Sequence, residues 1–316
     1  MPNESAFEDP SRLSGLIDVL AGLSTEQANT DRGDLDLLST IDLVTAMNAE
    51  DRRVPEAVAA QAGNIALAVD GITARFRRGG RLIYIGAGTA GRVGVLDASE
   101  CPPTFGTDPS MVVGLIAGGD TAIRSAVENA EDDADAAVAS LRELGLTEAD
   151  TVVGISASGR TPYVVGGLTY ARGIGALTVA IAANAGSAIG AAAEIPIEVV
   201  VGPEFVTGST RLKAGTAQKL VVNMLSTLSM IRLGKTYRGV MVDLRATNEK
   251  LHARSVRTLI QLTGAAQDDA VRALVEADGS VKLALLMLFT GASAQAAAPA
   301  LADADGILRD AIAALS

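Results

Sequence analysis

The sequence predicts an α/β protein built on a doubly wound parallel sheet with helices on both faces. Short apolar runs at residues 81–85, 111–117, 151–155, 176–181 and 195–201 indicate five strands. Helix-like stretches separate them, and continuous apolar strands that alternate with helices are typical of parallel sheets buried on both faces. Aromatic residues make up only 3% of the chain and tryptophan is absent. This composition favours closely packed helices over an aromatic-rich β-sandwich.

Between the strands, the spacing of apolar residues predicts four helices. The first of them leads into Pro102 and Pro103, which we expect to stop it, because proline lacks the backbone N–H and clashes with the preceding turn. The expected helices cover residues 92–100, 122–144, 163–173 and 187–193.

Helices also precede and follow the predicted sheet. Helical spacing occurs over residues 16–23 and 43–47, with Asp42 or Thr40 as the cap of the second stretch, and a helix at about 55–77 leads into the first strand. A long helix at about 210–233 follows the sheet. The end of the chain looks all-helical, at 251–262, 266–277, 281–288 and 302–315, with glycines at 264, 279 and 291 between helices. We expect three parts: an N-terminal helical segment (1–60), a sheet domain (61–245) and a C-terminal helical subdomain (246–316).

Composition and charge exclude several classes of protein. With 26 basic and 37 acidic residues the net charge is −11, and no basic patch suggests a nucleic-acid partner. Cys101 is the sole cysteine, so an intrachain disulfide is impossible and a reducing cytosol is the natural setting. The first residues lack the pattern of a signal peptide, and the uncharged stretch 173–193 suits strand, loop and short helix better than a membrane span. We expect a cytoplasmic protein with no membrane partner.

The first predicted strand runs into the loop GAGTAG at residues 86–91, which fits the pattern G-x-G-x-x-G. A dinucleotide site would need an acidic residue at the end of the second strand, and the nearest candidate, Asp120, lies about 30 residues on. A purely structural tight turn is another interpretation. We favour the binding of a phosphate group, with Thr89 helping, because backbone N–H groups at a helix start attract anions.

A second loop, SASGRT at residues 156–161, follows the third predicted strand. Ser156, Ser158 and Thr161 can coordinate a phosphate monoester without a metal, together with backbone N–H groups. The alternative is a hydroxyl-rich helix cap. Two such loops at neighbouring strand ends indicate a phosphorylated small molecule as the ligand.

Several charged residues are candidates for acid–base chemistry. Glu100 lies just before the Pro-Pro pair, where partial burial would raise its pKa and suit it to act as a general acid; the alternative is a surface glutamate. Residues 126–133 form an acidic stretch in which Glu128 and Glu131 would share one face of a helix, although acidic helix faces are usually solvated. His252, the sole histidine, has an acid–base role or only caps and packs a helix.

A further polar loop, at residues 207–211, enters the long helix. Arg211 and Lys213 would suit an anionic substrate. The competing interpretation is a plain helix start.

Longer motifs resemble the N-acetylmuramic acid 6-phosphate etherase family, and the resemblance runs from about residue 23 to 264. The family carries a sugar isomerase (SIS) domain, a flavodoxin-like parallel sheet that binds phosphosugars, and is expected to work as a homodimer. The motifs are GAGTAGR (86–92), LDASECPPT (96–104), SASGRTPY (156–163), TGSTR (207–211), KAGTAQK (213–219) and ATNEKLH (246–252).

The resemblance implies cleavage of the lactyl ether of N-acetylmuramic acid 6-phosphate, giving N-acetylglucosamine 6-phosphate and D-lactate in the recycling of cell-wall sugars. One carboxylate removes the proton at C2 of the open-chain sugar and a carboxylic acid protonates the departing lactyl oxygen at C3, which needs no metal and no organic cofactor. By resemblance the acid is Glu100 and the second glutamate is Glu131, to which we assign proton abstraction, with Glu128 as its rival. Phosphate contacts fall to Thr89, Ser156, Ser158 and Thr161.

One position departs from the pattern of related phosphosugar-binding domains, which commonly have serine where this chain has Ala90. The missing hydroxyl would weaken phosphate binding by about 0.5–1.5 kcal/mol if nothing replaces it.

Two other functions compete with the etherase. A phosphosugar isomerase would share the proton abstraction without releasing lactate, and a non-catalytic phosphosugar-binding regulator would need the loops but neither glutamate.

Overall fold

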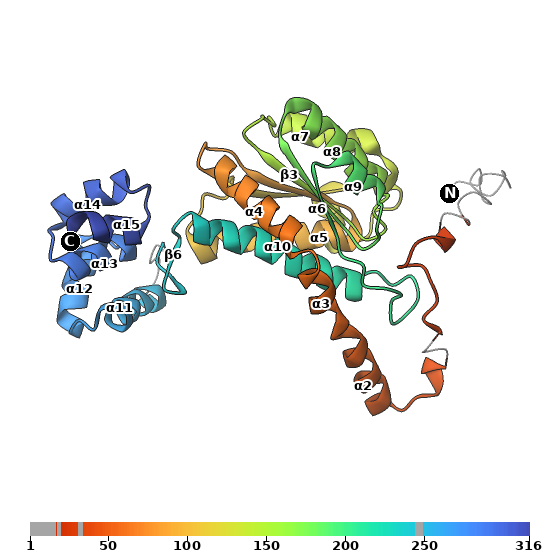
Figure 1. Cartoon of the computed structure of the whole chain (residues 1–316), viewed down its shortest axis with the longest axis horizontal. Helices are drawn as coiled ribbons and strands as arrows, with labels where there is room; N and C mark the ends of the chain where they lie inside the picture. Colours follow the sequence, from red (N-terminus) through yellow and green to blue (C-terminus); the bar gives the residue numbers. More distant parts are fainter. Residues whose placement is uncertain (1–16, 18–19, 31–33, 244–248) are drawn as a thin grey trace. The chain divides into compact units, whose positions relative to one another are not determined.

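The computed structural model describes residues 17, 20–30, 34–243 and 249–316 (Figure 1). The predicted helix over 16–23 and the start of the motif at 246–252 fall partly outside the described residues. The chain divides into two compact units. The first holds the described residues of Met1–Ala98 together with Val112–Leu225, and the second holds Ser99–Met111 together with the described residues of Ser226–Ser316.

A five-stranded parallel sheet forms the centre of the first unit, and its spatial order is β2-β1-β3-β4-β5. This is the flavodoxin-like order, in which the chain reverses its direction of winding between β1 and β3. Strands β1, β3 and β4 are buried along their whole length, as their continuous apolar sequences predict. The strands are β1 (Leu82–Gly86), β2 (Val112–Ile116), β3 (Thr151–Ser156), β4 (Leu177–Ala182) and β5 (Ile195–Glu198).

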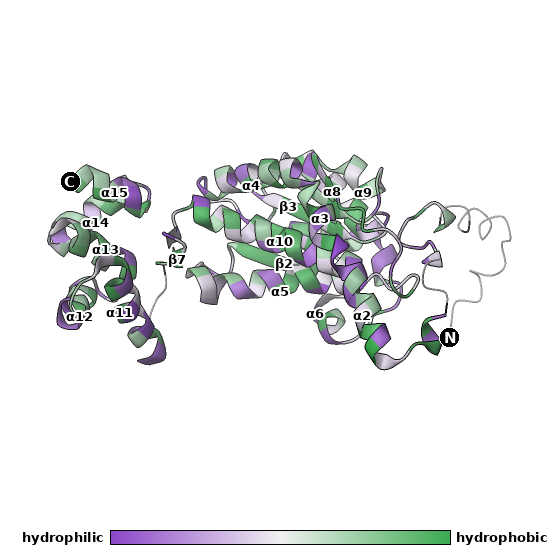
Figure 2. Cartoon of the chain, turned by 60° about the horizontal axis from the view of Figure 1, so that its bottom comes forward, coloured by the Kyte–Doolittle hydropathy of each residue, from purple (hydrophilic) through white to green (hydrophobic). Residues whose placement is uncertain are grey.

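Helices cover both faces of this sheet. Figure 1 shows α7, α8 and α9 on one side of β3 and α4, α5 and α10 on the other, and in Figure 2 the visible strands are mainly coloured as hydrophobic. The helices of this part of the chain are α2 (Thr40–Asp51), α3 (Arg53–Ala59), α4 (Ala62–Phe76), α5 (Gly88–Phe105), α6 (Gly119–Arg124), α7 (Ala134–Glu143), α8 (Pro162–Ile174), α9 (Ala188–Ala192) and α10 (Lys213–Arg232), with the short 3-10 helices η3 (Leu35–Leu37) and η4 (Ala130–Asp132).

The prediction that Pro102 and Pro103 stop the first inter-strand helix is wrong. Helix α5 includes both prolines and continues to Phe105. The buried side chains of Cys101 and Phe105 anchor this last stretch, so packing outweighs the hydrogen bonds that the prolines forgo. Gly106, with a φ of 63°, lies directly after the helix, and its N–H donates to the carbonyl of Pro102.

The single helix predicted over 122–144 is also wrong, and with it the helical face shared by Glu128 and Glu131. Helix α6 ends at Arg124, Asn129 takes a left-handed conformation, and η4 follows. The carboxylate of Asp133 then accepts hydrogen bonds from two backbone N–H groups of α7. An N-cap at Asp133 starts a new helix there, so the acidic stretch is a loop at the carboxyl end of β2.

Three smaller predictions also need correction. The helix expected at about 55–77 is two helices, α3 and α4, that meet near Gln61. The cap of α2 is Ser39, whose hydroxyl accepts from the N–H of Asp42, rather than Asp42 or Thr40. The helix expected at 302–315 starts within the last turn of α14, most of which was not predicted, and continues as the separate helix α15, because Asp305 and Gly306 have positive φ angles.

The second unit is mostly helical and has its own apolar core. A two-stranded antiparallel hairpin, β6 (Thr236–Tyr237) with β7 (Val240–Met241), precedes the helices and was not predicted. Glycines 264, 279 and 291 lie between successive helices, as predicted, and each has a positive φ. The helices are α11 (Glu249–Thr263), α12 (Gln267–Glu276), α13 (Val281–Thr290), α14 (Ala294–Asp303) and α15 (Leu308–Leu315).

Within the described residues, no single helix is both long and apolar enough to cross a membrane, and two sharply bent helix pairs meet that criterion only when each pair is counted together.

An ion pair joins the amino ends of β1 and β3. Asp150 accepts hydrogen bonds from the backbone N–H of Arg81 (2.8 Å) and from its guanidinium (3.0 and 2.8 Å). Thr147 N–H also donates to it (2.8 Å), and Arg81 reaches the carbonyls of Leu144 and Gly145 after α7. Burial alone would raise the pKa of Asp150, but the hydrogen bonds from Arg81 and Thr147 and the charge of Arg81 hold that pKa below its ordinary value.

We predict that the variant Asp150→Asn unfolds more easily than the wild type at pH 7, by about 2–3 kcal/mol, because it leaves the Arg81 charge without its partner. A depressed native pKa contributes stability above the unfolded-state pKa of about 3.9 and loses it as the pH falls through the native value. The difference in unfolding free energy between the wild type and the variant should therefore become smaller at acidic pH. Urea denaturation at pH 7, 5 and 3 measures this, with the exposed Asp310→Asn as control; equal stability at pH 7 would refute it.

Candidate active site

Two loops leave the sheet at the point where its winding reverses. In the parallel register Gly86, the last residue of β1, pairs with Ile155 near the end of β3, so the loops after both strands lie at the same edge of the sheet. Ligands of open α/β sheets bind outside the carboxyl ends of the strands at such a switch point. The two loops singled out in the sequence therefore meet where the fold places its binding site.

The loop after β1 needs its glycines for packing as well as for binding. A side chain on Gly86 would come within 2.8 Å of the N–H nitrogen of Gly91, and one on Gly91 within 2.6 Å of Ile116. Gly88 has a φ of 53° and opens α5 directly. The tight-turn interpretation is thus correct for Gly86 and Gly91, while Thr89 and Ala90 line a cavity.

The loop after β3 is a compact cluster of hydroxyl groups. The buried Ser156 hydroxyl shares hydrogen bonds with those of Thr161 (2.8 Å) and Ser158 (3.3 Å), and it accepts from the N–H of Gly159 (3.0 Å). Gly159 has a φ of 75°, and a side chain there would meet Ser187. The side chain of Thr161, at the start of α8, makes no capping bond to the helix backbone. The hydroxyls thus face one another at a helix start rather than serving as a cap.

These loops enclose a cavity of about 260 Å³ that suits a small polar ligand. Five of its twelve lining residues carry a hydroxyl group, and the helix dipoles of α5 and α8 favour negative charge there. The lining residues are Glu26, Ala87, Gly88, Thr89, Ala90, Glu131, Ser156, Ala157, Ser158, Thr161, Thr210 and Gln218. No lysine or arginine is among these residues, so an anion bound here would have to be held by neutral donors and dipoles.

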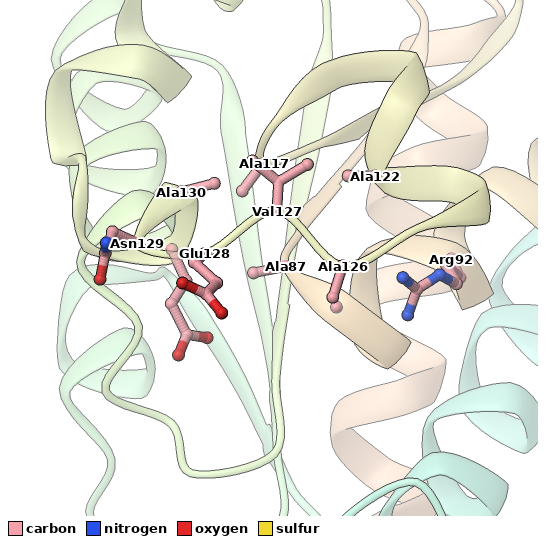
Figure 3. Close-up of a pocket in the computed structure, with 11 residues that line it drawn as sticks. Ala87, Arg92, Ala117, Ala122, Ala126, Val127, Glu128, Asn129 and Ala130 are labelled. Atoms are coloured by element: carbon pink, nitrogen blue, oxygen red, sulfur yellow. The ribbon is translucent and has the colours of Figure 1, made fainter. Parts of the chain in front are cut away.

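An adjoining cavity of about 240 Å³ contains both glutamates of the acidic loop. Figure 3 shows Glu128 and Arg92 on opposite sides of the small side chains of Ala87 and Ala126. Glu131 lines both cavities, whereas Glu128 lines this one. The structure thus brings Glu131 together with Thr89, Ser156, Ser158 and Thr161.

Two other predicted residues, Glu100 and His252, are not among the residues that line these cavities. Glu100 is exposed, and it lies twelve residues beyond Gly88 on α5, an axial rise of about 18 Å. The partial burial expected for it is therefore absent from the single chain. His252 is exposed on α11, in the second unit.

The two cations at the start of α10, Arg211 just before the helix and Lys213 at its first residue, do not line the cavities. Lys213 is only 1% exposed, and its ammonium group lies 3.0 Å from the carboxylate of Glu50. It is therefore committed to a buried ion pair rather than to a substrate. Arg211 is exposed and is not among the residues that line the two cavities.

Sequence reasoning missed Glu26, Thr210 and Gln218. Glu26 follows a segment that Asn184 ties to the loop after β3. The amide oxygen of Asn184 accepts from the N–H and hydroxyl of Ser24 (both 2.8 Å), and its NH₂ group donates to Thr25 and to the carbonyl of Ala157 (both 3.1 Å). Thr210 and Gln218 lie within the motifs TGSTR and KAGTAQK, which were noted for other residues. Membership in those motifs was the sequence signal that could have identified them as site residues.

Within the described part of the chain, no three His, Cys, Asp or Glu side chains gather to hold a metal ion.

Comparisons with known proteins agree with this geometry. Residues 127–228 match the family described as SIS domain, and residues 64–172 match the glucokinase regulatory protein N-terminal SIS domain. The chain is 61% identical over 269 residues to an N-acetylmuramic acid 6-phosphate etherase of Streptomyces coelicolor, covering 85% of this chain and 86% of that protein. It is 56% identical to N-acetylmuramic acid 6-phosphate etherase 2 of Lactiplantibacillus plantarum, covering 85% and 91% of the two chains.

We predict that Ser156→Ala weakens the binding of inorganic phosphate about tenfold, because the change removes the hydroxyl that joins Ser158, Thr161 and Gly159 and leaves a buried N–H without its acceptor. Isothermal titration calorimetry measures the dissociation constant. The control is Ser110→Ala, on an exposed loop before β2. Unchanged phosphate affinity in Ser156→Ala would remove the hydroxyl cluster as the phosphate site.

Proposed function

The chain belongs to the N-acetylmuramic acid 6-phosphate etherase family, and from that premise we propose how its cavity carries out the reaction. The protein is a carbon–oxygen lyase that cleaves the lactyl ether of N-acetylmuramic acid 6-phosphate in the recycling of cell-wall sugars. Identity of 54–61% over 84–86% of the chain to eight curated etherases is the observation that carries this conclusion.

The phosphate group of the substrate would lie against the hydroxyl cluster, held by Thr89, Ser156, Ser158 and Thr161. What supports this is the gathering of these four side chains around one cavity at the starts of α5 and α8. Ala90 also lines the cavity, so its methyl group occupies the position where a serine would add another donor. Anchoring the phosphate would place the sugar carbons beside Glu131.

Glu131 would act as the base. The C2–H bond of the open-chain sugar breaks, the proton passes to the Glu131 carboxylate, and the electron pair forms an enolate with the C1 aldehyde. The C3–O bond then breaks with its electron pair leaving on the lactyl oxygen, which takes a proton from Glu100. Water adds at C3 of the unsaturated aldehyde and C2 regains a proton, giving N-acetylglucosamine 6-phosphate and D-lactate. Glu131, rather than Glu128, is supported by its place in both cavities.

The two competing functions are less well supported. An isomerase would abstract the same proton but release no lactate, and a regulator would bind the phosphosugar without either glutamate. Family membership favours the etherase over both, and D-lactate release is the property that separates them.

The protein would act as a cytoplasmic homodimer. A reducing compartment suits the single buried cysteine, Cys101. Helix α10 exposes Met224, Leu228 and Ile231 at i, i+4 and i+7, an apolar stripe that a second copy would cover. A second copy that covered Glu100 would also supply the burial that this side chain lacks in the single chain. The partners are then the phosphorylated amino sugar and another copy of the chain, with no nucleic acid or membrane.

We predict that two matched variants separate the steps of the reaction in D₂O. Glu131→Gln should stop both D-lactate release and exchange of the C2 proton, because no base remains to break the C2–H bond. Glu100→Gln should stop lactate release while exchange persists, because the leaving oxygen alone loses its proton source. Each loss should exceed 10²-fold, measured by a lactate assay and by mass spectrometry of deuterium at C2.

The control for this pair is Glu128→Gln, a carboxylate of the same loop, which should retain at least a third of the wild-type rate. Exchange that persists in Glu131→Gln but disappears in Glu128→Gln would transfer the role of base to Glu128. Lactate release at the wild-type rate by Glu100→Gln would eliminate that residue as the acid.

We predict that Leu228→Glu converts the dimer into a monomer, because a charge in the centre of the α10 stripe cannot be buried without a partner. Sedimentation equilibrium should show the mass falling from twice 32.1 kDa to the mass of one chain, with lactate release falling at least tenfold. Leu67→Glu, an exposed leucine on α4, is the control. A wild-type monomer with full activity would contradict the proposed dimer.

A further inference from the structure

Gln218 is a polar side chain of the cavity whose amide nitrogen lacks a hydrogen-bond acceptor among the described residues. The residue is 2% exposed, it lines the larger cavity, and its amide nitrogen Nε2 is buried with no acceptor in the described part of the chain. A buried donor without a partner costs stability, so native proteins rarely retain one without a reason. An oxygen atom of a bound ligand would satisfy it.

The helix that carries Gln218 is fixed at its start by three contacts. The buried carboxylate of Glu204 accepts from the N–H groups of Lys213 (2.8 Å) and Ala214 (3.0 Å), and the Lys213 ammonium is paired with Glu50 at 3.0 Å. The backbone of Gly215 lies beside Thr89, because a side-chain carbon on Gly215 would be in van der Waals contact (3.4 Å) with the methyl group of Thr89. Gln218 lies one turn further along α10, so its amide is held against the cavity before any ligand arrives.

The charges around the cavity indicate which oxygen Gln218 serves. Glu26 and Glu131 bring two carboxylates, and no lysine or arginine is among the lining residues. The phosphate already has the hydroxyl cluster and two helix starts. The aldehyde oxygen at C1 gains negative charge when the C2–H bond breaks and has no donor assigned to it. Neutral donors aimed at developing charge in a closed site are among the largest contributors to catalysis.

We propose that the Nε2 group of Gln218 donates a hydrogen bond to the C1 oxygen of the open-chain sugar and stabilises the enolate, an inference that rests on the proposed function. As Glu131 takes the C2 proton, the electron pair of the C2–H bond becomes the C1–C2 double bond. The pair of the C1=O bond moves onto the oxygen, which accepts the hydrogen bond. Gln218 neither gains nor loses a proton, and it is a catalytic residue in the sense that it touches a reacting atom.

The test compares Gln218→Met, which keeps the length of the side chain without the donor, with Gln218→Glu, which keeps its shape. The rate of C2 exchange in D₂O should fall about 10²–10³-fold in Gln218→Met, the usual loss for one such donor, and further in Gln218→Glu because a third carboxylate opposes the enolate. The inhibition constant of inorganic phosphate should stay within twofold in Gln218→Met. Its melting temperature should equal or exceed that of the wild type, because the orphan donor is gone.

Gln261→Met, an exposed change on α11, is the matched control and should leave all these values unchanged. A parallel loss of phosphate affinity in Gln218→Met would make Gln218 a phosphate ligand and overturn the proposal. An unchanged exchange rate, or a fall in rate that follows a fall in melting temperature in both variants, would overturn it as well. Failure of the wild type to release lactate would instead refute the proposed function, and C2 exchange without lactate release would still test Gln218.

Discussion

The parallel register between β1 and β3 is the constraint on which the rest of the first unit depends. Because Leu82 pairs with Thr151 and Gly86 with Ile155, the ends of the two strands coincide on both edges of the sheet. At one edge the coincidence places Arg81 beside Asp150, and their ion pair ties both strands to the end of α7. At the other edge it places two glycine- and hydroxyl-rich loops side by side. A slip of one residue would break the ion pair and separate the two halves of the cavity together.

The strand positions could be predicted closely because each strand is a continuous apolar run, which the local sequence alone shows. The helix boundaries were harder to predict where tertiary packing or a capping residue overrides the local helix preference. Pro102 and Pro103 are breakers by their own chemistry, yet Cys101 and Phe105 hold the helix together through burial. The acidic stretch before Asp133 looked helical because nothing in its composition forbids a helix. The left-handed Asn129 and the cap at Asp133 became evident only in three dimensions.

The binding loops were predictable for a similar reason, since each is contiguous in sequence and its chemistry is local. Ser156, Ser158, Thr161, Thr89 and Glu131 do meet at one cavity. The other wall of that cavity comes from residues far away along the chain, Glu26, Thr210 and Gln218, and no periodicity connects them to the loops. For Glu100 the motif could be found in the sequence, but the surroundings of the side chain could not. Its motif is conspicuous in sequence, but its surroundings in a single chain do not supply the burial that its expected role requires. Sequence patterns thus locate the chemistry more readily than the environment that tunes it.

The hydrogen bonds between Asn184 and the segment at Ser24 and Thr25 have a consequence for how the protein matures. They join Ser24 to a residue 160 positions later, so a chain emerging from the ribosome must wait roughly 8–30 s between making one half of the contact and the other. Strand β4 has to be complete before the early segment can dock. The first four strands can therefore pair while the cavity still lacks one wall, and contacts of such long range are among the slow steps of folding. A newly made chain would thus acquire most of its parallel sheet before its ability to hold a ligand.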